Sequence, residues 1–523
     1  MRVLLIAPPH SLEEHPTPPL SLGYLSAALQ SRDIEVDILD LLTSKPSAAK
    51  IRRRLEQCRP QLVGVTCVTM NFASAARILR VSKEADPEIT TVIGGPHVTF
   101  AVDDTLRRCP WIDVVVLGEA DATIVELASA LASHEDIGQI PGIAFAHNGT
   151  TITTRDRPFI EELDGLPLPA RELLPLSRYK ALDASCSVIS TRGCPYGCVF
   201  CSAPKLFGRR VRFRTPELVV DEIESISQDL GFRRVNIVDD TFTLNHKHTH
   251  ALCQEIIRRN LSVEWNAYSR VDTLDRHTLE HMKEAGCTFI VFGIESGSQQ
   301  ILDRVGKGIT VEKARQCVKM VSEVGMGSFA SFILGLPGET PQTARQSLEL
   351  AREFFDHYGV QYGFHFLSPL PGTAIYERPG DFGLRVLTRH WARYNANEPI
   401  TEAGPGSLLA VREIAREYDE TIQEGWEKIR VLADAGDKPS TEALRNHEAR
   451  LFVWELLRND TIEALGNIKG VASPREAEEK LIDRVCKKME APAHVVVQEL
   501  SRLSGMGLLR PRLSGDRCQW QWA

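Results

Sequence analysis

Residues 190–204 read STRGCPYGCVFCSAP and place Cys194, Cys198 and Cys201 in one short loop with the spacing CxxxCxxC. Thiolates are the ligands of iron–sulfur clusters, and three of them leave one iron of a [4Fe–4S] cluster open to another ligand. Gly193 and Gly197 let the backbone wrap closely around such a group. A structural zinc site would need a fourth cysteine or histidine at matched spacing, and three unrelated buried cysteines are the simplest alternative. The loop therefore predicts a cluster with an open iron.

The cysteine loop follows the first strand of an alternating array of strands and helices. The strand candidates are residues 186–193, 233–240, 262–270, 289–296, 327–338 and 361–369. Helical stretches such as 216–230 and 311–325 lie between them. Six such units predict a parallel, curved and partly closed (β/α)6 barrel over residues 185–382, two units short of a full barrel.

The loop at the end of a first barrel strand, with Phe200 just before its third cysteine, resembles the radical S-adenosylmethionine (SAM) superfamily. In that family the open iron chelates SAM, and one electron from the cluster cleaves it to methionine and a 5′-deoxyadenosyl radical. The resemblance implies SAM contacts at Phe200, Asp240, Arg270, Glu295, Gly335 and Leu336. The last segment departs from the family pattern Gly-x-Ile-x-Gly-x-x-Glu, because Ser331 replaces the first glycine and Glu339 comes one place late. An aspartate that caps a helix and a salt bridge at Glu295 are the simpler alternatives.

Residues 1–148 form an earlier array in which β-branched runs alternate with helical stretches. Runs that are apolar on both faces predict a parallel sheet with helices on both sides, which is a doubly wound α/β domain. Such sheets bind ligands at the carboxyl ends of their strands. A domain of this kind before a radical SAM barrel resembles the cobalamin-binding (class B) methyltransferase branch. The resemblance implies cobalamin contacts at Pro9, His10, Leu22, Gly23, Thr66, Thr69, Met70, Asn71, Gly94, Gly95, His97, Gly118 and Glu119.

The Asp-x-His-x-x-Gly motif that supplies a histidine ligand to cobalt in other cobalamin proteins is absent from the sequence. His10, His15 and His97 lack that context, and we expect them to be hydrogen-bonding loop residues instead. The resemblance places the lower corrin face over residues 69–71. Since a strong axial donor would hinder release of a methyl radical equivalent, we predict cobalamin without a histidine ligand.

The remaining segments are expected to connect and to cover the two domains. Residues 149–184 contain four prolines and predict a linker. Residues 383–523 are mostly helical and end in two helices and a hairpin, which predicts a winged-helix-like end. Without a basic face, this end is expected to be a packing or substrate-recognition appendage rather than a DNA reader.

Composition excludes several classes of protein. The 523 residues carry a formal net charge of −8 with no basic stripe, which argues against a nucleic-acid partner. Twelve cysteines, three of them in one loop, indicate a reducing compartment rather than a disulfide scaffold. No apolar run reaches the roughly 18 residues that span a bilayer, so we expect a cytoplasmic protein without membrane insertion.

The resemblance implies an enzyme that methylates an unactivated carbon of a small molecule or natural-product intermediate. One SAM molecule would remethylate cobalamin, a second would yield the 5′-deoxyadenosyl radical, and a reductant such as flavodoxin or ferredoxin would supply electrons. The alternatives are a cobalamin-dependent cyclase or ring-rearrangement enzyme and a non-enzymatic redox sensor. RNA methylthiolation is disfavoured because the N-terminal region lacks three clustered cysteines. Six aromatic residues belong either to a substrate pocket or to the core: Trp265, Tyr268, Tyr362, Phe364, Phe366 and Trp391.

Overall fold

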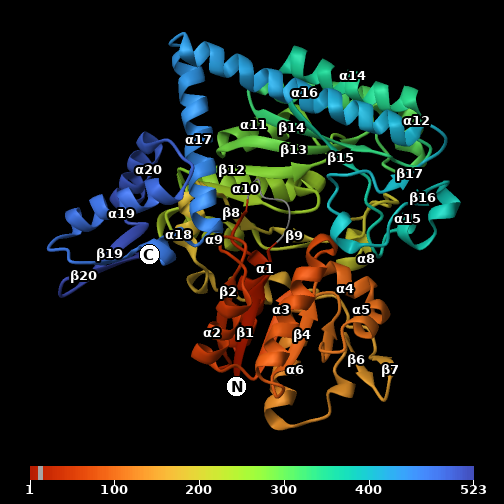
Figure 1. Ribbon diagram of the computed structural model, residues 1–523. Coiled ribbons are helices and arrows are strands. Elements are labelled where there is room, and N and C mark those ends of the chain that lie inside the picture. The colour runs from red at the N-terminus through yellow and green to blue at the C-terminus, as the bar shows by residue number, and fades with distance from the viewer. Residues whose placement is uncertain (10–15) are drawn as a thin grey trace.

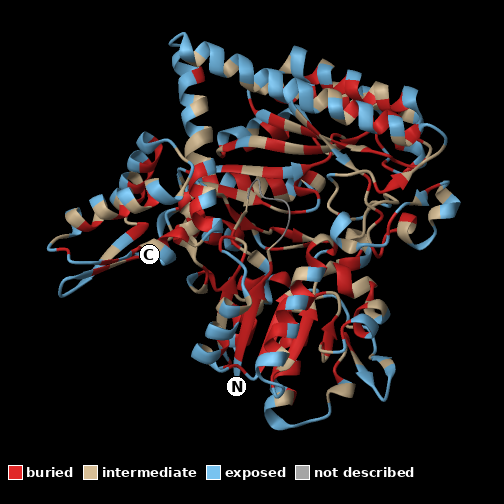
Figure 2. Cartoon of the chain, viewed as in Figure 1, coloured by how far each residue is buried: buried red, intermediate tan, exposed pale blue. Residues whose placement is uncertain are grey.

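The computed structural model describes residues 1–9 and 16–523 and contains two large, mainly parallel sheets (Figure 1). The first sheet is coloured red to orange in Figure 1, and the second is mainly green. The strands of both sheets are largely buried, whereas the outer faces of the surrounding helices are exposed (Figure 2). The predicted class, a doubly wound domain followed by a partial barrel and a helical C-terminal region, is confirmed.

The first sheet has the strand order β2-β1-β3-β4-β5-β6-β7, and β1 to β5 are parallel. The order reverses beside β1, which creates the crevice where doubly wound sheets bind ligands. Its strands are β1 (Arg2–Ala7), β2 (Glu35–Asp40), β3 (Leu62–Thr66), β4 (Thr90–Gly94), β5 (Val114–Val116), β6 (Ile143–His147) and β7 (Thr150–Thr153). Its helices are α1 (Leu20–Gln30), α2 (Ala48–Cys58), α3 (Phe72–Ala85), α4 (Pro96–Phe100), α5 (Val102–Arg108) and α6 (Asp121–Ser133). The antiparallel strands β6 and β7 carry this sheet to Thr153, inside the stretch that the sequence assigns to the linker.

Both faces of the first sheet are covered because its central strands are apolar on both sides. Leu4 and Ile6 belong to one buried cluster, and their neighbours Val3 and Leu5 belong to another. Successive side chains of a strand point to opposite faces, so the two clusters lie on the two sides of the sheet. Both faces of the sheet are therefore closed to a ligand, and the carboxyl ends of the strands remain as its binding place.

The second sheet is a curved, open array with the order β15-β14-β13-β12-β11-β8, and all its pairs are parallel. Its strands are β8 (Cys186–Val188), β11 (Arg234–Ile237), β12 (Glu264–Ser269), β13 (Cys287–Glu295), β14 (Gly327–Leu334) and β15 (Gln361–Phe366). Its helices are α9 (Pro216–Gln228), α10 (His246–Arg258), α11 (Arg276–Glu284), α12 (Gln299–Arg304), α13 (Val311–Val324) and α14 (Pro341–Tyr358). The six strands of the partial barrel were all predicted from sequence.

Short elements connect the two sheets and continue the barrel. They are α7 (Leu176–Ala181), β9 (Thr191–Arg192), α8 (Ala203–Leu206), β10 (Arg212–Phe213), α15 (Ala374–Glu377), β16 (Arg385–Val386) and β17 (Thr401–Glu402). Helix α7 contacts the first sheet through Tyr179, whose hydroxyl donates to Asp40 at the end of β2. This buried bond ties the connecting segment to the first sheet.

The C-terminal region consists of long helices and a small sheet. Its elements are α16 (Ser407–Asp434), α17 (Lys438–Arg458), α18 (Thr461–Leu465), β18 (Asn467–Lys469), α19 (Pro474–Lys488), α20 (Ala493–Gly505), β19 (Leu509–Ser514) and β20 (Arg517–Trp522). Helix α16 runs along α14 of the barrel, and Tyr418 on it donates to Tyr362 O at 3.0 Å (Figure 1). Strand β18 adds a third strand to the predicted hairpin, and its three residues are too few to show a periodic pattern. No helix in the described part of the chain is long and apolar enough to cross a membrane.

Candidate active site at the meeting of the two domains

Backbone hydrogen bonds shape the cysteine loop, which lies between β9 and its antiparallel partner β10. Cys194 N donates to Gly208 O at 3.1 Å, and Cys201 N donates to Cys198 O at 3.1 Å. All three cysteines of the loop are free and partly exposed. The structure therefore keeps the three predicted cluster ligands available in one loop.

The loop fits a [4Fe–4S] cluster in both its backbone and its donor atoms. Gly193 has a φ of +110°, and a Cβ there would lie 2.6 Å from Arg210 O, so the entry into the loop requires glycine. A Cβ at Gly197 would meet nothing closer than 3.8 Å, which leaves space over the loop. Burial raises the pKa of Cys194 and raises that of Cys201 to about 11. These thiols thus keep their protons until a metal displaces them.

Arg270, a predicted SAM contact, fastens the cysteine loop to the end of β12. Its guanidinium lies 3.6 Å from the centre of the Tyr196 ring, which is a cation–π contact. It donates to Asp272 at 2.9 and 3.0 Å and to Lys307 O at 2.7 Å. These contacts give Arg270 a structural role, and its contact with SAM stays a prediction.

Glu295 ends β13 with a φ of +71°, which is uncommon for a residue other than glycine. Its Oε1 accepts a hydrogen bond from Lys307 Nζ at 2.6 Å, and both side chains are buried. The salt bridge considered as the simpler alternative is therefore present. Strained backbone of this kind concentrates at functional sites, so the predicted SAM contact remains compatible with the ion pair.

The two aspartates after β11 differ in what they face. Asp239 Oδ1 accepts from Ser190 N at 2.7 Å and from Thr191 N at 3.0 Å, and so orders the backbone that enters the cysteine loop. Asp240 instead lines a cavity. Its carboxyl is open to that cavity but desolvated by the surrounding protein, which together with Asp239 raises its pKa to about 6. Asp240 is thus the aspartate that faces a ligand space.

The segment after β14, to which the resemblance assigns adenine packing, consists largely of core residues. Leu336 is fully buried in an apolar cluster that also includes Phe200 and Val305. Gly335 has a φ of +89°, and its N–H donates to Glu339 Oε2. The other oxygen, Glu339 Oε1, is buried and has no partner among the described residues, and burial raises the pKa of this carboxyl to about 8. Leu336 is therefore a core residue in this structure, and its contact with SAM stays a prediction.

A cavity of about 690 Å³ opens where the carboxyl ends of the first sheet meet the cysteine-loop side of the barrel. From the first domain it is lined by the loops after β1, β3, β4 and β5 and by one side of α1. From the barrel it is lined by Ile189, Thr191, Arg192, Leu206, Phe207, Val238 and Asp240. Five of these residues, up to Phe207, flank the cysteine loop in the sequence, and Asp240 is a predicted SAM contact, so the cavity joins the two predicted cofactor sites.

Most of the predicted cobalamin residues lie on this cavity. The lining includes Leu22, Thr66, Met70, Asn71, Gly94, Gly95, Gly118 and Glu119. Pro9, Gly23, Thr69 and His97 are described but do not line it, and His10 lies outside the described residues. Gly118 has a φ of +63°, and a Cβ there would meet nothing within 4 Å, so this loop presents bare backbone to the cavity. Small side chains and bare backbone fit a large, flat group such as a corrin.

His97 is a buried packing residue. Its Nδ1 lies 3.2 Å from Thr69 Oγ1, and its ring packs 4.5 Å from that of Phe72 and 5.0 Å from that of Trp391. Desolvation lowers the pKa of His97 to about 4, so the ring is neutral. The contact with Thr69 fits the hydrogen-bonding role expected from the sequence, but His97 lies in helix α4 and not in a loop. Within residues 1–9 and 16–523, no histidine lines the cavity, and His15 lies in the segment between.

Glu119 lines the cavity, but its carboxylate is already paired with arginines of the barrel. Its Oε2 accepts from Arg212 at 2.9 Å and from Ile160 N at 2.8 Å, and its Oε1 lies 3.5 Å from Arg192. Arg192 also pairs with Asp121 at 2.9 Å. These ion pairs cross from the first domain to the barrel and were not found from the sequence. The pairing depends on how the domains dock, which no local pattern encodes.

A second buried network stands beside the first. Glu222 of α9 accepts from Arg171 at 2.7 Å and from Arg214 at 2.6 Å. Arg214 also lies 3.3 Å from the hydroxyl of Tyr24, which lines the cavity. Burial is the main cause of a strongly raised pKa of Tyr24, so its hydroxyl stays protonated. The Glu119 and Glu222 networks thus connect the first-domain side of the cavity to the barrel at two places.

Five of the six aromatic residues of the sequence analysis belong to the packing, whereas Tyr268 is 41% exposed. None of them is among the described residues that line the cavity. Trp265 is buried and donates from Nε1 to Ala285 O at 2.7 Å, while Tyr362 and Phe364 pack against Tyr418. The core alternative therefore fits five of these rings, and none of the six lines the cavity between the two domains.

The fold and the site together define a class of enzyme. In this class, a partial barrel with a loop of three cysteines and a doubly wound cofactor-binding domain line one cavity. Comparisons with known proteins identify both parts. Residues 188–351 match the family described as the radical SAM superfamily, and residues 14–128 match the B12 binding domain.

Relatives extend this match over most of the chain. An uncharacterized methyltransferase of Pyrococcus horikoshii is 34% identical over 76% of this chain and 87% of its own. An anaerobic magnesium-protoporphyrin IX monomethyl ester cyclase of Rubrivivax gelatinosus is 32% identical over 73% of this chain and 69% of its own. The solved structure of the radical SAM methyltransferase TsrM from Kitasatospora setae, with tryptophan substrate and a SAM analogue, shares the fold. It has a TM-score of 0.65 at 21% identity and covers 79% of this chain and 88% of that one.

The chain belongs to the cobalamin-dependent radical SAM methyltransferase family. The family predicted from the sequence is confirmed, and so is its cofactor set of a [4Fe–4S] cluster, SAM and cobalamin. The protein is an enzyme, so the non-enzymatic sensor is excluded.

Proposed function

We propose that this enzyme transfers a methyl group to an unactivated carbon of a small molecule or natural-product intermediate. The observation that carries the proposal is the cavity of about 690 Å³, which both domains line. Predicted cobalamin loops reach it from one side, and Asp240 and the residues flanking the cysteine loop reach it from the other. A single space shared by both cofactor sites is what transfer of a methyl group to a substrate radical requires.

The chain itself holds the reactants and excludes water. When bound, cluster and SAM would supply the hydrogen-abstracting radical, and cobalamin would supply the methyl group. Leu206 and Phe207 on the barrel side and Val68 and Met70 on the other side give the cavity apolar walls. Such walls protect a reactive species from solvent. The buried ion pairs of Glu119 hold the two walls against each other.

The lining of the cavity favours a mainly apolar substrate with few polar groups. Asp240, Thr191 and Arg192 are polar side chains on the barrel side, where they can orient such a molecule.

We also propose that flavodoxin or ferredoxin in the cytoplasm reduces the cluster.

A cyclase or ring-rearrangement enzyme without methyl transfer is the second candidate, and the 32% identical cyclase of Rubrivivax gelatinosus favours it. Both reactions begin with reductive cleavage of SAM. They differ in whether a second SAM molecule loses its methyl group. Because SAM without its methyl group is S-adenosylhomocysteine, only methyl transfer forms this product.

The test is an anaerobic incubation of the enzyme, reconstituted with iron, sulfide and cobalamin, with methyl-labelled SAM and a reductant. Methyl transfer predicts 5′-deoxyadenosine together with S-adenosylhomocysteine by mass spectrometry. Deoxyadenosine without S-adenosylhomocysteine, while cobalamin is bound and reduced, would favour the cyclase. Absence of deoxyadenosine from fully loaded enzyme would contradict both. Cys198→Ala is the control, because it removes one cluster ligand and should abolish deoxyadenosine formation.

A further inference from the structure

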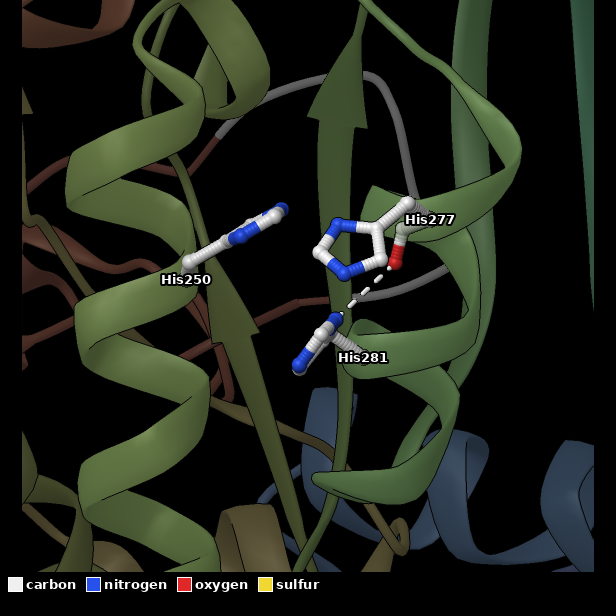
Figure 3. Close-up of side chains that lie close together, drawn as sticks. All are labelled: His250, His277 and His281. Atoms are coloured by element: carbon white, nitrogen blue, oxygen red, sulfur yellow. Dashed lines mark hydrogen bonds between the residues drawn. The ribbon is translucent and has the colours of Figure 1, made fainter.

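Three histidines outside the cavity converge in the space between α10 and α11 (Figure 3). His250 comes from α10, and His277 and His281 come from α11. One ligand nitrogen of each lies within 4.8 Å of the others. The ring centres are 4.8 Å apart for His250 and His277, 4.8 Å for His250 and His281, and 4.3 Å for His277 and His281. We propose that these histidines bind a divalent transition-metal ion, with zinc as the expected occupant.

Helix geometry explains why the three rings meet. His277 and His281 are four residues apart and therefore lie on one face of α11. Leu279 and Met282, on the other face, are buried against the barrel. Helix α10 packs beside α11, so His250 is directed to the same space from the opposite side (Figure 3). The arrangement is set by two rigid helices rather than by loops.

Hydrogen bonds at the ring nitrogens suit metal binding. His281 Nδ1 lies 3.1 Å from the carbonyl oxygen of His277, and His250 Nε2 lies 3.0 Å from Thr278 Oγ1. When each of these nitrogens donates its proton, the other nitrogen of the ring carries the free lone pair. For His281 that nitrogen is Nε2, which Figure 3 shows turned away from His277, so metal binding requires rotation of this ring. Histidine ligands of metals are commonly held in this way through the nitrogen that does not bind the metal.

The spacing is close to that of a zinc site. Zinc–nitrogen bonds of about 2.0–2.1 Å in a tetrahedron place ligand nitrogens about 3.4 Å apart. The largest separation of 4.8 Å must therefore shrink by about 1.4 Å. His250 and His281 are half-buried and His277 is exposed, so rotation of these side chains can close the distance. Imidazole nitrogens favour zinc, copper, nickel and iron over calcium or magnesium.

His246 extends the row of histidines but is engaged elsewhere. Its Nε2 lies 2.9 Å from Thr273 O, and its Nδ1 lies 3.2 Å from Asp275 Oδ2. Asp275 also accepts from Thr278 N at 2.7 Å and caps α11. The site thus has three protein ligands and leaves a fourth tetrahedral position to water. Bound zinc would link α10 to α11, the helices that follow β11 and β12, and Asp240 and Arg270 lie just after these two strands.

The test is a zinc titration of the holoenzyme, in which iron already occupies the cysteine loop. Zinc content after removal of free metal should be one ion per chain, and a competing chromogenic chelator gives the affinity. His250→Ala or His281→Ala removes a metal ligand and should weaken zinc binding by at least about 100-fold. Loss of a residue that only hydrogen-bonds to a ligand weakens metal binding by about 10- to 100-fold, so loss of a ligand itself should have a larger effect. Thr278→Val should weaken it about 10-fold. His357→Ala, at an exposed histidine on α14, is the matched control and should leave zinc affinity unchanged.

A second measurement needs no variant. X-ray absorption at the zinc edge of the zinc-loaded wild-type enzyme should show three imidazole nitrogens at about 2.0 Å. Sulfur neighbours at about 2.3 Å would instead place the metal at cysteines and overturn the proposal. Less than stoichiometric zinc in wild type, or equal zinc affinity in wild type and His250→Ala, would also overturn it.

Discussion

Glu119→Gln is predicted to weaken the joint between the two domains. The Glu119 and Arg212 side chains are only 2% and 3% exposed, and their charged atoms lie 2.9 Å apart. The amide can still accept from Ile160 N, but it removes the charge that faces Arg212 and Arg192. Arg212 then loses its anionic partner and keeps only neutral acceptors, among them the carbonyl oxygens of Ile160 and Phe207. An uncompensated buried charge is strongly unfavourable, and breaking such a pair costs about 3–5 kcal/mol.

At about 2–4 °C per kcal/mol for a unit of 150–250 residues, this loss corresponds to a drop in melting temperature of roughly 6–20 °C. Thermal unfolding of the wild type and the variant, followed by circular dichroism on the enzyme without cofactors, measures it. Glu161→Gln is the matched control. Its pair with Arg210 has the same chemistry at 2.8 Å, but the two side chains are 59% and 80% exposed. An exposed pair contributes about 0–1 kcal/mol, so the control should barely shift the melting temperature.

The outcome that refutes this reasoning is an equal shift in both variants. A double variant, Glu119→Gln with Arg212→Gln, sharpens the test. If the cost comes from an unpaired buried charge, the double variant should be less destabilised than the sum of the two single variants.

Two further predictions concern single residues of the barrel. Gly193→Ala should lower the iron content after reconstitution, because a Cβ there would lie 2.6 Å from Arg210 O at a φ of +110°. Gly197→Ala, where the nearest atom is 3.8 Å away, should retain iron, and equal losses would refute the argument. Glu339→Gln should remove a pH dependence of stability. Because the folded-state pKa of Glu339 is raised to about 8, the folded state binds the proton more tightly, and wild-type stability falls as pH rises from about 4.5 to 8. Melting temperatures of wild type and variant that change in parallel over this range would contradict the assignment.

The sequence predicted those parts of the fold that depend on local pattern. The CxxxCxxC loop and the six barrel strands were located because thiol spacing and apolar runs are local signals. The same holds for the glycines on the cavity, since Gly94 ends β4, Gly95 directly follows it, and Gly118 lies in the loop after β5. Strand β18 was missed because three residues carry no period.

What the sequence missed depends on contacts between distant segments. Glu119 was assigned to cobalamin, and nothing local shows that Arg192 and Arg212 would reach it from the barrel. His277 and His281 were not predicted as a site, although their four-residue spacing on an expected helix is a local signal. His250 could be added only once α10 and α11 were known to pack together.

The central claim is that both cofactors meet at one cavity between the two domains. Anomalous diffraction at the iron and cobalt edges, from crystals of the enzyme loaded with cluster and cobalamin, tests it most directly. The account predicts an iron peak at Cys194, Cys198 and Cys201 and a cobalt peak within the cavity beside the loops that carry Met70, Gly95 and Gly118. A cobalt peak outside that cavity, or an iron peak away from the three cysteines, would contradict it.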